Sequence, residues 1–158
     1  MSISRTDERI KEREMSVPTG QRTESKAEYL NIAMELDIHT KTCCRKFPKS
    51  AMFITTTYIV QTADSIGRHV AQANARFPRT QFDIEYRREH LQNARGLLDW
   101  LDFQVQQAYA QYGNQPCCTE GKIKITPYAW QKWSQLIGRM KSMVEGVLAS
   151  DRKLLSQA

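Results

Sequence analysis

The sequence predicts an all-α protein: an up-down-up-down antiparallel four-helix bundle with a charged N-terminal arm. In four long stretches, apolar residues recur at alternating steps of three and four, which is the spacing of one helix face. Mostly short turn segments separate these stretches, and short connections favour antiparallel neighbours. With 158 residues, the chain is long enough to bury a real core as one domain.

The beginning of the chain differs from the rest in composition. Residues 1–22 are predicted to form a flexible charged arm, and residues 23–158 the bundle. The stretch from Arg5 to Glu14 is almost wholly charged, with Ile10 as its only apolar residue. Pro18 and Gly20 then interrupt the chain. Such a segment buries too little apolar surface to offset the entropy lost on ordering it.

The first helix is predicted over residues 25–46. Ser25 and Glu28 have the spacing of a capping box at its start. Pro48 ends the helix, because proline disfavours helical geometry in the residue before it. The expected buried side holds Tyr29, Ile32, Ala33, Leu36, Cys43 and Phe47, and the polar Thr40 falls within this stripe.

The second helix is predicted over residues 50–77. It carries a seam, a line of apolar residues along one helix face, against which the other helices are expected to pack. Its expected buried residues are Met52, Ile59, Ala63, Ile66, Val70, Ala73 and Phe77. The segment 53–60 is rich in β-branched and aromatic residues, which favour strands. It does not alternate apolar with polar residues, however, and the helical period continues through it, so we predict helix.

The third and fourth helices are predicted over residues 81–112 and 127–149. In the third, Ile84, Leu91, Leu98, Val105 and Tyr112 repeat every seven residues, with Ala94, Leu101 and Ala108 at the alternate positions. Asp83–Arg87 and Arg95–Asp99 are expected ion pairs on its outer face. The fourth begins with Thr126 as N-cap and Pro127 at its first position. It buries Trp130, Trp133, Ile137, Met140, Val144 and Val147, whereas Ile54, Tyr58, Phe103 and Leu136 are expected outside the helix seams.

No enzyme is predicted, and no catalytic residue, cofactor or metal site. The Glu-x-x-His pairs of di-metal bundles, the phosphate-binding glycine loop and the nucleophile elbow are all missing from the sequence. Asp99 and Asp102 share a helix face, but Arg95 is nearby, so we interpret them as a solvated face.

The four cysteines form two adjacent pairs, Cys43-Cys44 and Cys117-Cys118. In the predicted topology both pairs lie at one end of the bundle, where they could meet and hold a metal or form a disulfide. The alternative is that Cys43 or Cys44 packs as a small apolar residue, while the loop thiols are free. Neither pair has the Cys-x-x-Cys spacing of zinc sites, which favours the alternative.

The net charge of +6 favours an anionic partner such as nucleic acid or an acidic protein surface. Arginine and lysine on outward faces can neutralise phosphates and so give salt-dependent binding. The alternative is a solubilising surface with no ligand. The candidate nucleic-acid-binding residues are Arg68, Arg76, Arg79, Arg87, Arg88, Arg95, Lys132, Arg139 and Lys141.

Three groups of residues suggest a family. They are Lys46-Phe47-Pro48-Lys49, then Arg88-Glu89-His90-Leu91 with Leu97-Leu98-Asp99-Trp100-Leu101, and then Trp130 with Ile137-Gly138-Arg139-Met140 and Gly146. From Tyr29 to Leu148 the chain resembles the four-helix-bundle proteins that include the accessory variability determinant of diversity-generating retroelements. The same superfamily includes bundle proteins encoded in intervening sequences of 23S ribosomal RNA genes. The charged arm, the cysteine-containing loop and Gly146-Val147, where the family often has Gly-Trp, depart from the pattern.

The resemblance implies a homopentamer that binds a reverse transcriptase and RNA or DNA, and that supports mutagenic retrohoming without being a catalyst. The alternative is a structural or protein-interaction bundle of the ribosomal-intervening-sequence type, or a phage-borne adaptor. The sequence contains no run of about 18 apolar residues, so no membrane span is expected. The charged first residues do not resemble a secretory signal, and we therefore expect a cytoplasmic protein.

Overall fold

The computed structural model describes residues 21–113 and 125–157, and in that part of the chain it is helical without strands. The long helices are α2 (Gln21–Cys44), α3 (Thr57–Ala75), α4 (Gln81–Tyr112) and α5 (Pro127–Ser156). Two short elements, η1 (Lys49–Ala51) and η2 (Met52–Thr56), lead from α2 into α3. The all-α prediction is confirmed. No described helix is both long and apolar enough to cross a lipid bilayer.

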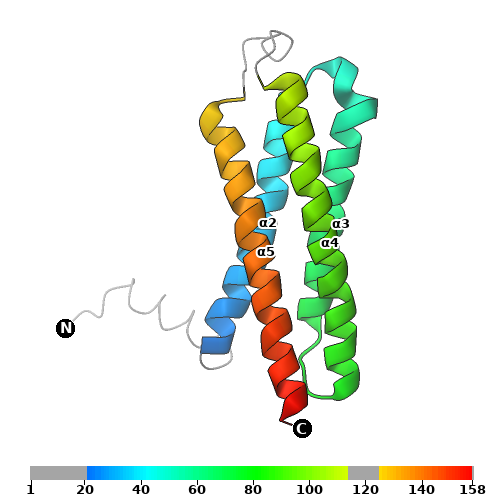
Figure 1. The fold of residues 1–158 in the computed structure, drawn as a ribbon, viewed down its shortest axis with the longest axis vertical. Coiled ribbons are helices and arrows are strands. Elements are labelled where there is room, and N and C mark those ends of the chain that lie inside the picture. Colours follow the sequence, from blue (N-terminus) through cyan, green and yellow to red (C-terminus); the bar gives the residue numbers. More distant parts are fainter. Residues whose placement is uncertain (1–20, 114–124, 158) are drawn as a thin grey trace, which may run out of the picture.

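The four long helices lie side by side along the long axis of the molecule (Figure 1). Helices α3 and α4 are joined at the lower end of the view, where α2 begins and α5 ends. Extensive contacts join α3 to α4, α4 to α5, α2 to α3 and α2 to α5. Each long helix therefore has two neighbours, and the ring of contacts encloses one core.

The predicted seams form this core. The largest fully buried side chains include Leu36, Ile59, Ile66, Val70, Leu91, Leu98, Leu101, Trp133, Ile137, Met140 and Val144. Leu136, expected outside the seam, is buried, whereas Ile54, Tyr58 and Phe103 are exposed as expected.

The polar Thr40 within the α2 stripe is explained by a buried hydrogen-bond chain. The Trp133 Nε1–H donates to the Thr40 hydroxyl at 2.9 Å, and that hydroxyl donates to the Leu36 carbonyl at 2.8 Å. Trp133 is completely buried, so its indole N–H needs an acceptor inside the protein. Thr40 supplies that acceptor and ties α2 to α5.

The prediction that Met52 and Phe77 belong to the seam is wrong. Their exposed fractions are 49% and 45%. Phe77 lies beyond the last residue of α3, Ala75, so the helical spacing no longer directs its side chain toward the core. Met52 begins the π-helical η2. A π turn holds one more residue than an α-helical turn, so the residues before it are rotated relative to the buried side of α3. Ala51, rather than Met52, is completely buried there.

The segment 53–60 is helical, as predicted against its strand propensity, but it begins as a π-helix. The Thr57 hydroxyl donates to the Met52 carbonyl at 2.6 Å, and the Thr57 backbone N–H donates to the same oxygen. Consecutive β-branched residues crowd the turns of an α-helix, which is consistent with a widened turn here. None of the five residues of η2 is buried.

The helix boundaries agree best where local capping signals are strong. Helix α4 begins and ends as predicted, and Thr80 and Asp83 form a capping box at its start. Helix α5 begins at Pro127, with the Thr126 hydroxyl accepting from the Ala129 N–H, but it continues to Ser156 instead of ending near residue 149. Helix α2 already begins at Gln21, so Ser25 lies inside it and the predicted start at residue 25 is wrong. The predicted arm, residues 1–22, lies almost wholly outside the described residues, so it stays a prediction.

Candidate functional site

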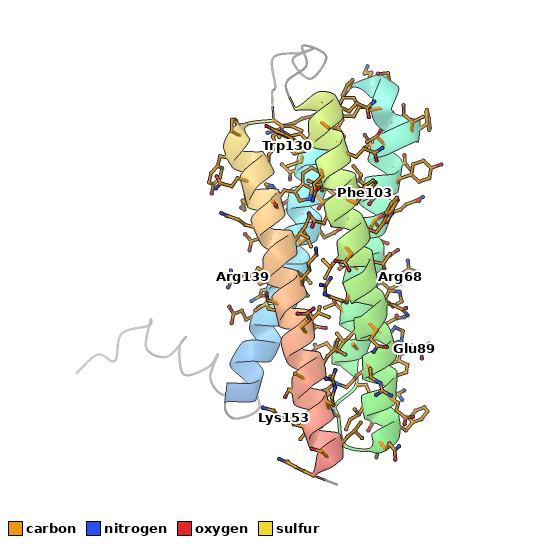
Figure 2. The ribbon with its side chains drawn as sticks, viewed as in Figure 1. Arg68, Glu89, Phe103, Trp130, Arg139 and Lys153 are labelled. Carbon is orange, nitrogen blue, oxygen red and sulfur yellow. The ribbon has the colours of Figure 1, made fainter. Side chains whose placement is uncertain are left out.

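The nine basic residues predicted to bind nucleic acid do not gather on one face. Helix α3 and the turn after it carry Arg68, Arg76 and Arg79; α4 carries Arg87, Arg88 and Arg95; and α5 carries Lys132, Arg139 and Lys141. Arg68 and Arg139 lie on opposite sides of the bundle (Figure 2). A nucleic-acid surface must therefore be built from a subset of the nine.

Arg87 does not belong to any surface, and its prediction as an outward phosphate-binding residue is wrong. Its side chain is buried, and its Nε and Nη2 donate to the two carboxylate oxygens of Asp151 at 2.8 and 3.3 Å. Its Nη1 donates to the carbonyls of Ala73 and Arg76 at the end of α3. The predicted Asp83–Arg87 pair is absent, because the Asp83 carboxylate accepts from the Thr80 N–H.

The buried ion pair between Arg87 and Asp151 had a sequence signal that was missed. Arg87 lies seven residues before Ala94, and Asp151 lies seven residues after Val144. Both therefore continue buried stripes of their helices. A charged residue on a buried stripe needs a partner of opposite charge, and these two satisfy each other.

An ion-pair network on α4 and α5 occupies two more of the predicted residues. Arg95 donates to Asp99, as predicted, and also to Glu145 at 2.9 Å. Lys141 contacts Asp99 at 3.1 Å and Asp102 at 3.0 Å. Hydrogen bonds from Arg95 and then Lys141 lower the pKa of Asp99, although burial opposes this. The acidic partners offset the positive charge of this region.

Two further basic residues on α5 pair with carboxylates on α2. Arg139 lies 2.6 Å from Glu28, and Lys132 lies 3.5 Å from Glu35. Pairs this exposed contribute little stability. They nevertheless reduce the positive potential that this side offers to a phosphate.

The arginines with the greatest freedom to bind phosphate lie on α3, α4 and the turn between them. Arg68 and Arg88 are exposed, and neither forms an ion pair with a described residue. Arg79 is also exposed, and its guanidinium carbon lies 5.3 Å from the centre of the Phe77 ring. Arg76 is half-buried and lies 3.8 Å from Asp83.

Aromatic rings accompany the arginines at the turn, a combination that the sequence did not reveal. The guanidinium carbon of Arg76 lies 4.1 Å from the centre of the Tyr86 ring and 5.2 Å from that of Phe82. Phe82 is 67% exposed. We call Arg76, Arg79, Phe82 and Tyr86 the turn surface. Cationic groups beside exposed rings are the elements from which single-strand binding sites are built.

A second exposed group lies near the opposite end of α3. Phe53, Ile54, Tyr58, Trp100 and Phe103 have exposed fractions between 51% and 81%, and we call them the apolar face. The Trp100 and Phe103 rings stack with centroids 5.7 Å apart. Phe103 lies in the upper half of α4 (Figure 2).

A groove of about 250 Å³ runs through this apolar face. Ile54, Tyr58 and Trp100 line it, together with the amide side chain of Gln104. The Gln104 Oε1 is buried and has no hydrogen-bond partner within the described residues. A large exposed apolar surface with an unpaired buried acceptor is typical of an interaction surface.

Cys43 and Cys44 pack as small buried residues with free thiols. Burial raises the pKa of Cys43 to about 11 and that of Cys44 to about 12, so neither is a thiolate near neutral pH. Cys117 and Cys118 lie outside the described residues, so a meeting of the two pairs stays a prediction. Among residues 21–113 and 125–157, no three potential ligands are placed to hold a metal.

Two of the three histidines meet between α3 and α4. The Nδ1 atoms of His69 and His90 are 2.9 Å apart, and the Tyr86 ring packs edge-on against His90 with centroids 4.6 Å apart. Burial, then His90 and Arg68, lower the pKa of His69. A hydrogen bond between the two nitrogens requires one donor and one acceptor, which a neutral pair can provide.

Comparison with known proteins does not place the chain in a family. No protein-family model, no curated protein and no solved structure matches it.

Proposed function

We propose that the chain is a non-catalytic accessory protein of a diversity-generating retroelement, which binds nucleic acid and a reverse transcriptase to support mutagenic retrohoming. The proposal takes the four helices as an up-down-up-down antiparallel bundle with a charged N-terminal arm, acting in the cytoplasm. Its support from the sequence is the resemblance between Tyr29 and Leu148. Its support from the structure is the turn surface.

The turn surface is the observation that carries nucleic-acid binding. Arg79 is exposed, and Arg76 is held against the rings of Phe82 and Tyr86. The guanidinium groups can neutralise phosphates, while the exposed Phe82 ring can stack on an unpaired base. Because a ring stacks on any base, this surface favours single strands without a sequence preference.

We expect Arg76→Gln/Arg79→Gln to weaken binding of a short single-stranded RNA. On single strands each phosphate contact contributes about 0.7 to the slope of log K against log salt concentration, so the slope should fall by about 1.4. Fluorescence anisotropy of labelled RNA at several salt concentrations measures it. The control is Lys132→Gln/Arg139→Gln, which removes the same charge from residues paired with Glu35 and Glu28.

The control variant should lose less affinity and less of the slope. Equal losses in both variants would show that RNA responds only to net charge, and the turn surface would be rejected as the site. Phe82→Ala separates stacking from charge: it should weaken binding by about 1–3 kcal/mol and leave the salt slope unchanged.

We also propose that the protein is a homo-oligomer, with the pentamer as the expected state. The apolar face supports this proposal. Five exposed apolar and aromatic side chains are costly on a monomer. Interface cores are enriched in the same residue types, and a second copy would also bring polar groups to the unpaired Gln104 Oε1.

We expect Trp100→Glu to reduce the particle mass in light scattering from an oligomer to a monomer. The carboxylate would be buried without a partner in the subunit contact, which is strongly unfavourable. Tyr128→Glu is the control, because Tyr128 is 72% exposed at the start of α5, on a different part of the bundle. A wild-type monomer, or an oligomer that tolerates Trp100→Glu, would contradict this interface.

The same apolar face favours one alternative, a structural or protein-interaction bundle of the ribosomal-intervening-sequence type or a phage-borne adaptor. Five of the nine predicted basic residues pair with carboxylates on the surface and a sixth pairs in the core, whereas the aromatic side chains remain exposed. The two proposed functions predict different neighbouring genes. A reverse-transcriptase gene with paired template and variable repeats beside this gene supports the retroelement proposal.

A further inference from the structure

A cavity of about 380 Å³ lies at the end of the bundle where α2 begins and α5 ends. Phe77 lines it from the turn after α3, and Met143, Val147 and Leu154 line it from α5. Its volume falls in the range of sites for small organic molecules. The cavity is distinct from the apolar face, which lies near the start of α3.

The polar wall of this cavity contains the buried ion pair. Both carboxylate oxygens of Asp151 accept hydrogen bonds from Arg87, and the other Arg87 bonds go to backbone carbonyls. The two opposite charges compensate each other at a separation of 2.8 Å. A charged ligand would therefore lose its hydration without finding an unpaired countercharge, so the wall favours an uncharged one.

Tyr29 adds one unused hydrogen-bonding group. This residue lines the cavity from α2 and is only 3% exposed, yet its hydroxyl has no hydrogen-bond partner among the described residues. Burial raises the pKa of this hydroxyl, so it stays protonated and able to donate. The accessible area of this hydroxyl oxygen is below 1 Å², so a ligand reaches it only if the cavity wall shifts slightly. A buried hydroxyl without a partner is unfavourable, and an oxygen atom of a ligand that reaches it would remove that penalty.

We propose that this cavity is a binding site for an uncharged, mainly apolar small molecule that carries one hydroxyl or carbonyl oxygen. The apolar part packs against Phe77, Met143 and Val147, and the oxygen accepts a hydrogen bond from the Tyr29 hydroxyl. The charge-compensated pair of Arg87 and Asp151 selects against ions. This activity does not depend on nucleic-acid binding.

The full-length protein can be titrated with 2-naphthol, an uncharged aromatic probe with one hydroxyl, and followed by calorimetry and by amide chemical shifts. We expect saturable binding of one molecule per chain, with shifts in the amides of residues 143–151. The anionic analogue 2-naphthoate should bind at least about tenfold more weakly. Tyr29→Phe removes the hydroxyl and should weaken 2-naphthol binding about five- to tenfold, the worth of a typical hydrogen bond.

Two glycines of α5 provide a matched pair of variants. A Cβ added at Gly146 or at Gly138 has no other atom within 4 Å, so both positions accept a larger side chain. Gly146 lines the cavity and Gly138 does not. Gly146→Leu should therefore occupy part of the cavity and weaken binding, whereas Gly138→Leu should bind 2-naphthol as the wild type does. Absence of saturable binding, equal affinity in the two leucine variants, or undiminished affinity in Tyr29→Phe would overturn the proposal.

Discussion

Replacement of Arg87 by Met is expected to lower the free energy of unfolding by about 3–5 kcal/mol. The substitution leaves the Asp151 carboxylate buried without its countercharge, and that side chain is only 6% exposed. It also removes the donor to the carbonyls of Ala73 and Arg76, which end α3. Denaturant unfolding followed by circular dichroism measures the loss.

Arg88→Met is the matched control for this substitution. Arg88 is the next residue of α4 and is exposed, with no ion pair to any residue that the structure describes, so its loss should change stability by about 0.5 kcal/mol or less. The double variant Arg87→Met/Asp151→Leu removes both charges and should recover much of the stability. Similar losses in Arg87→Met and Arg88→Met would show that the pair contributes nothing beyond an ordinary surface residue.

Replacement of Trp133 by Ala is expected to cost about 3–5 kcal/mol, the range for removing a large aromatic side chain from a core. Trp133 is completely buried and stacks on Trp130 with ring centroids 5.6 Å apart. Its loss would leave a cavity and would also remove the donor to the Thr40 hydroxyl. The unfolding midpoint in denaturant should fall without a change in the slope of the transition.

Tyr128→Ala, in the first turn of the same helix, should leave the midpoint nearly unchanged because Tyr128 is 72% exposed. Thr40→Val separates packing from hydrogen bonding: it keeps the volume of the side chain but removes the acceptor of Trp133, and should cost about 1–3 kcal/mol. Wild-type stability of Trp133→Ala would contradict the packing of α5 against α2.

The sequence was sufficient for the fold class because the seams are long and regular. Helix α4 was predicted to its ends, since its heptads run without interruption and Thr80 caps it. The end of α5 was missed for a physical reason: Asp151 looks polar in the sequence, but it is buried because Arg87 compensates its charge. Polarity alone does not reveal such compensation, which depends on a residue 64 positions away.

The candidate site was less predictable than the fold. A count of basic residues cannot distinguish Arg87, which is buried, from Arg88, which is exposed, because that difference depends on helix phase. Nor could it show that Arg139 and Lys132 face carboxylates on α2. The turn surface joins residues from the turn after α3 and the start of α4, and it depends on how that turn brings Arg76 onto the rings of Phe82 and Tyr86.

The π turn at Met52–Thr56 has a consequence for how the apolar face could change over evolutionary time. A turn with one additional residue is what a single-codon insertion into an α-helix would leave. Because the core resumes at Ile59, such an insertion alters the upstream residues while sparing the packing below it. Phe53 and Ile54 can then change without disturbing the core, and deletion of one codon would turn both side chains in a new direction.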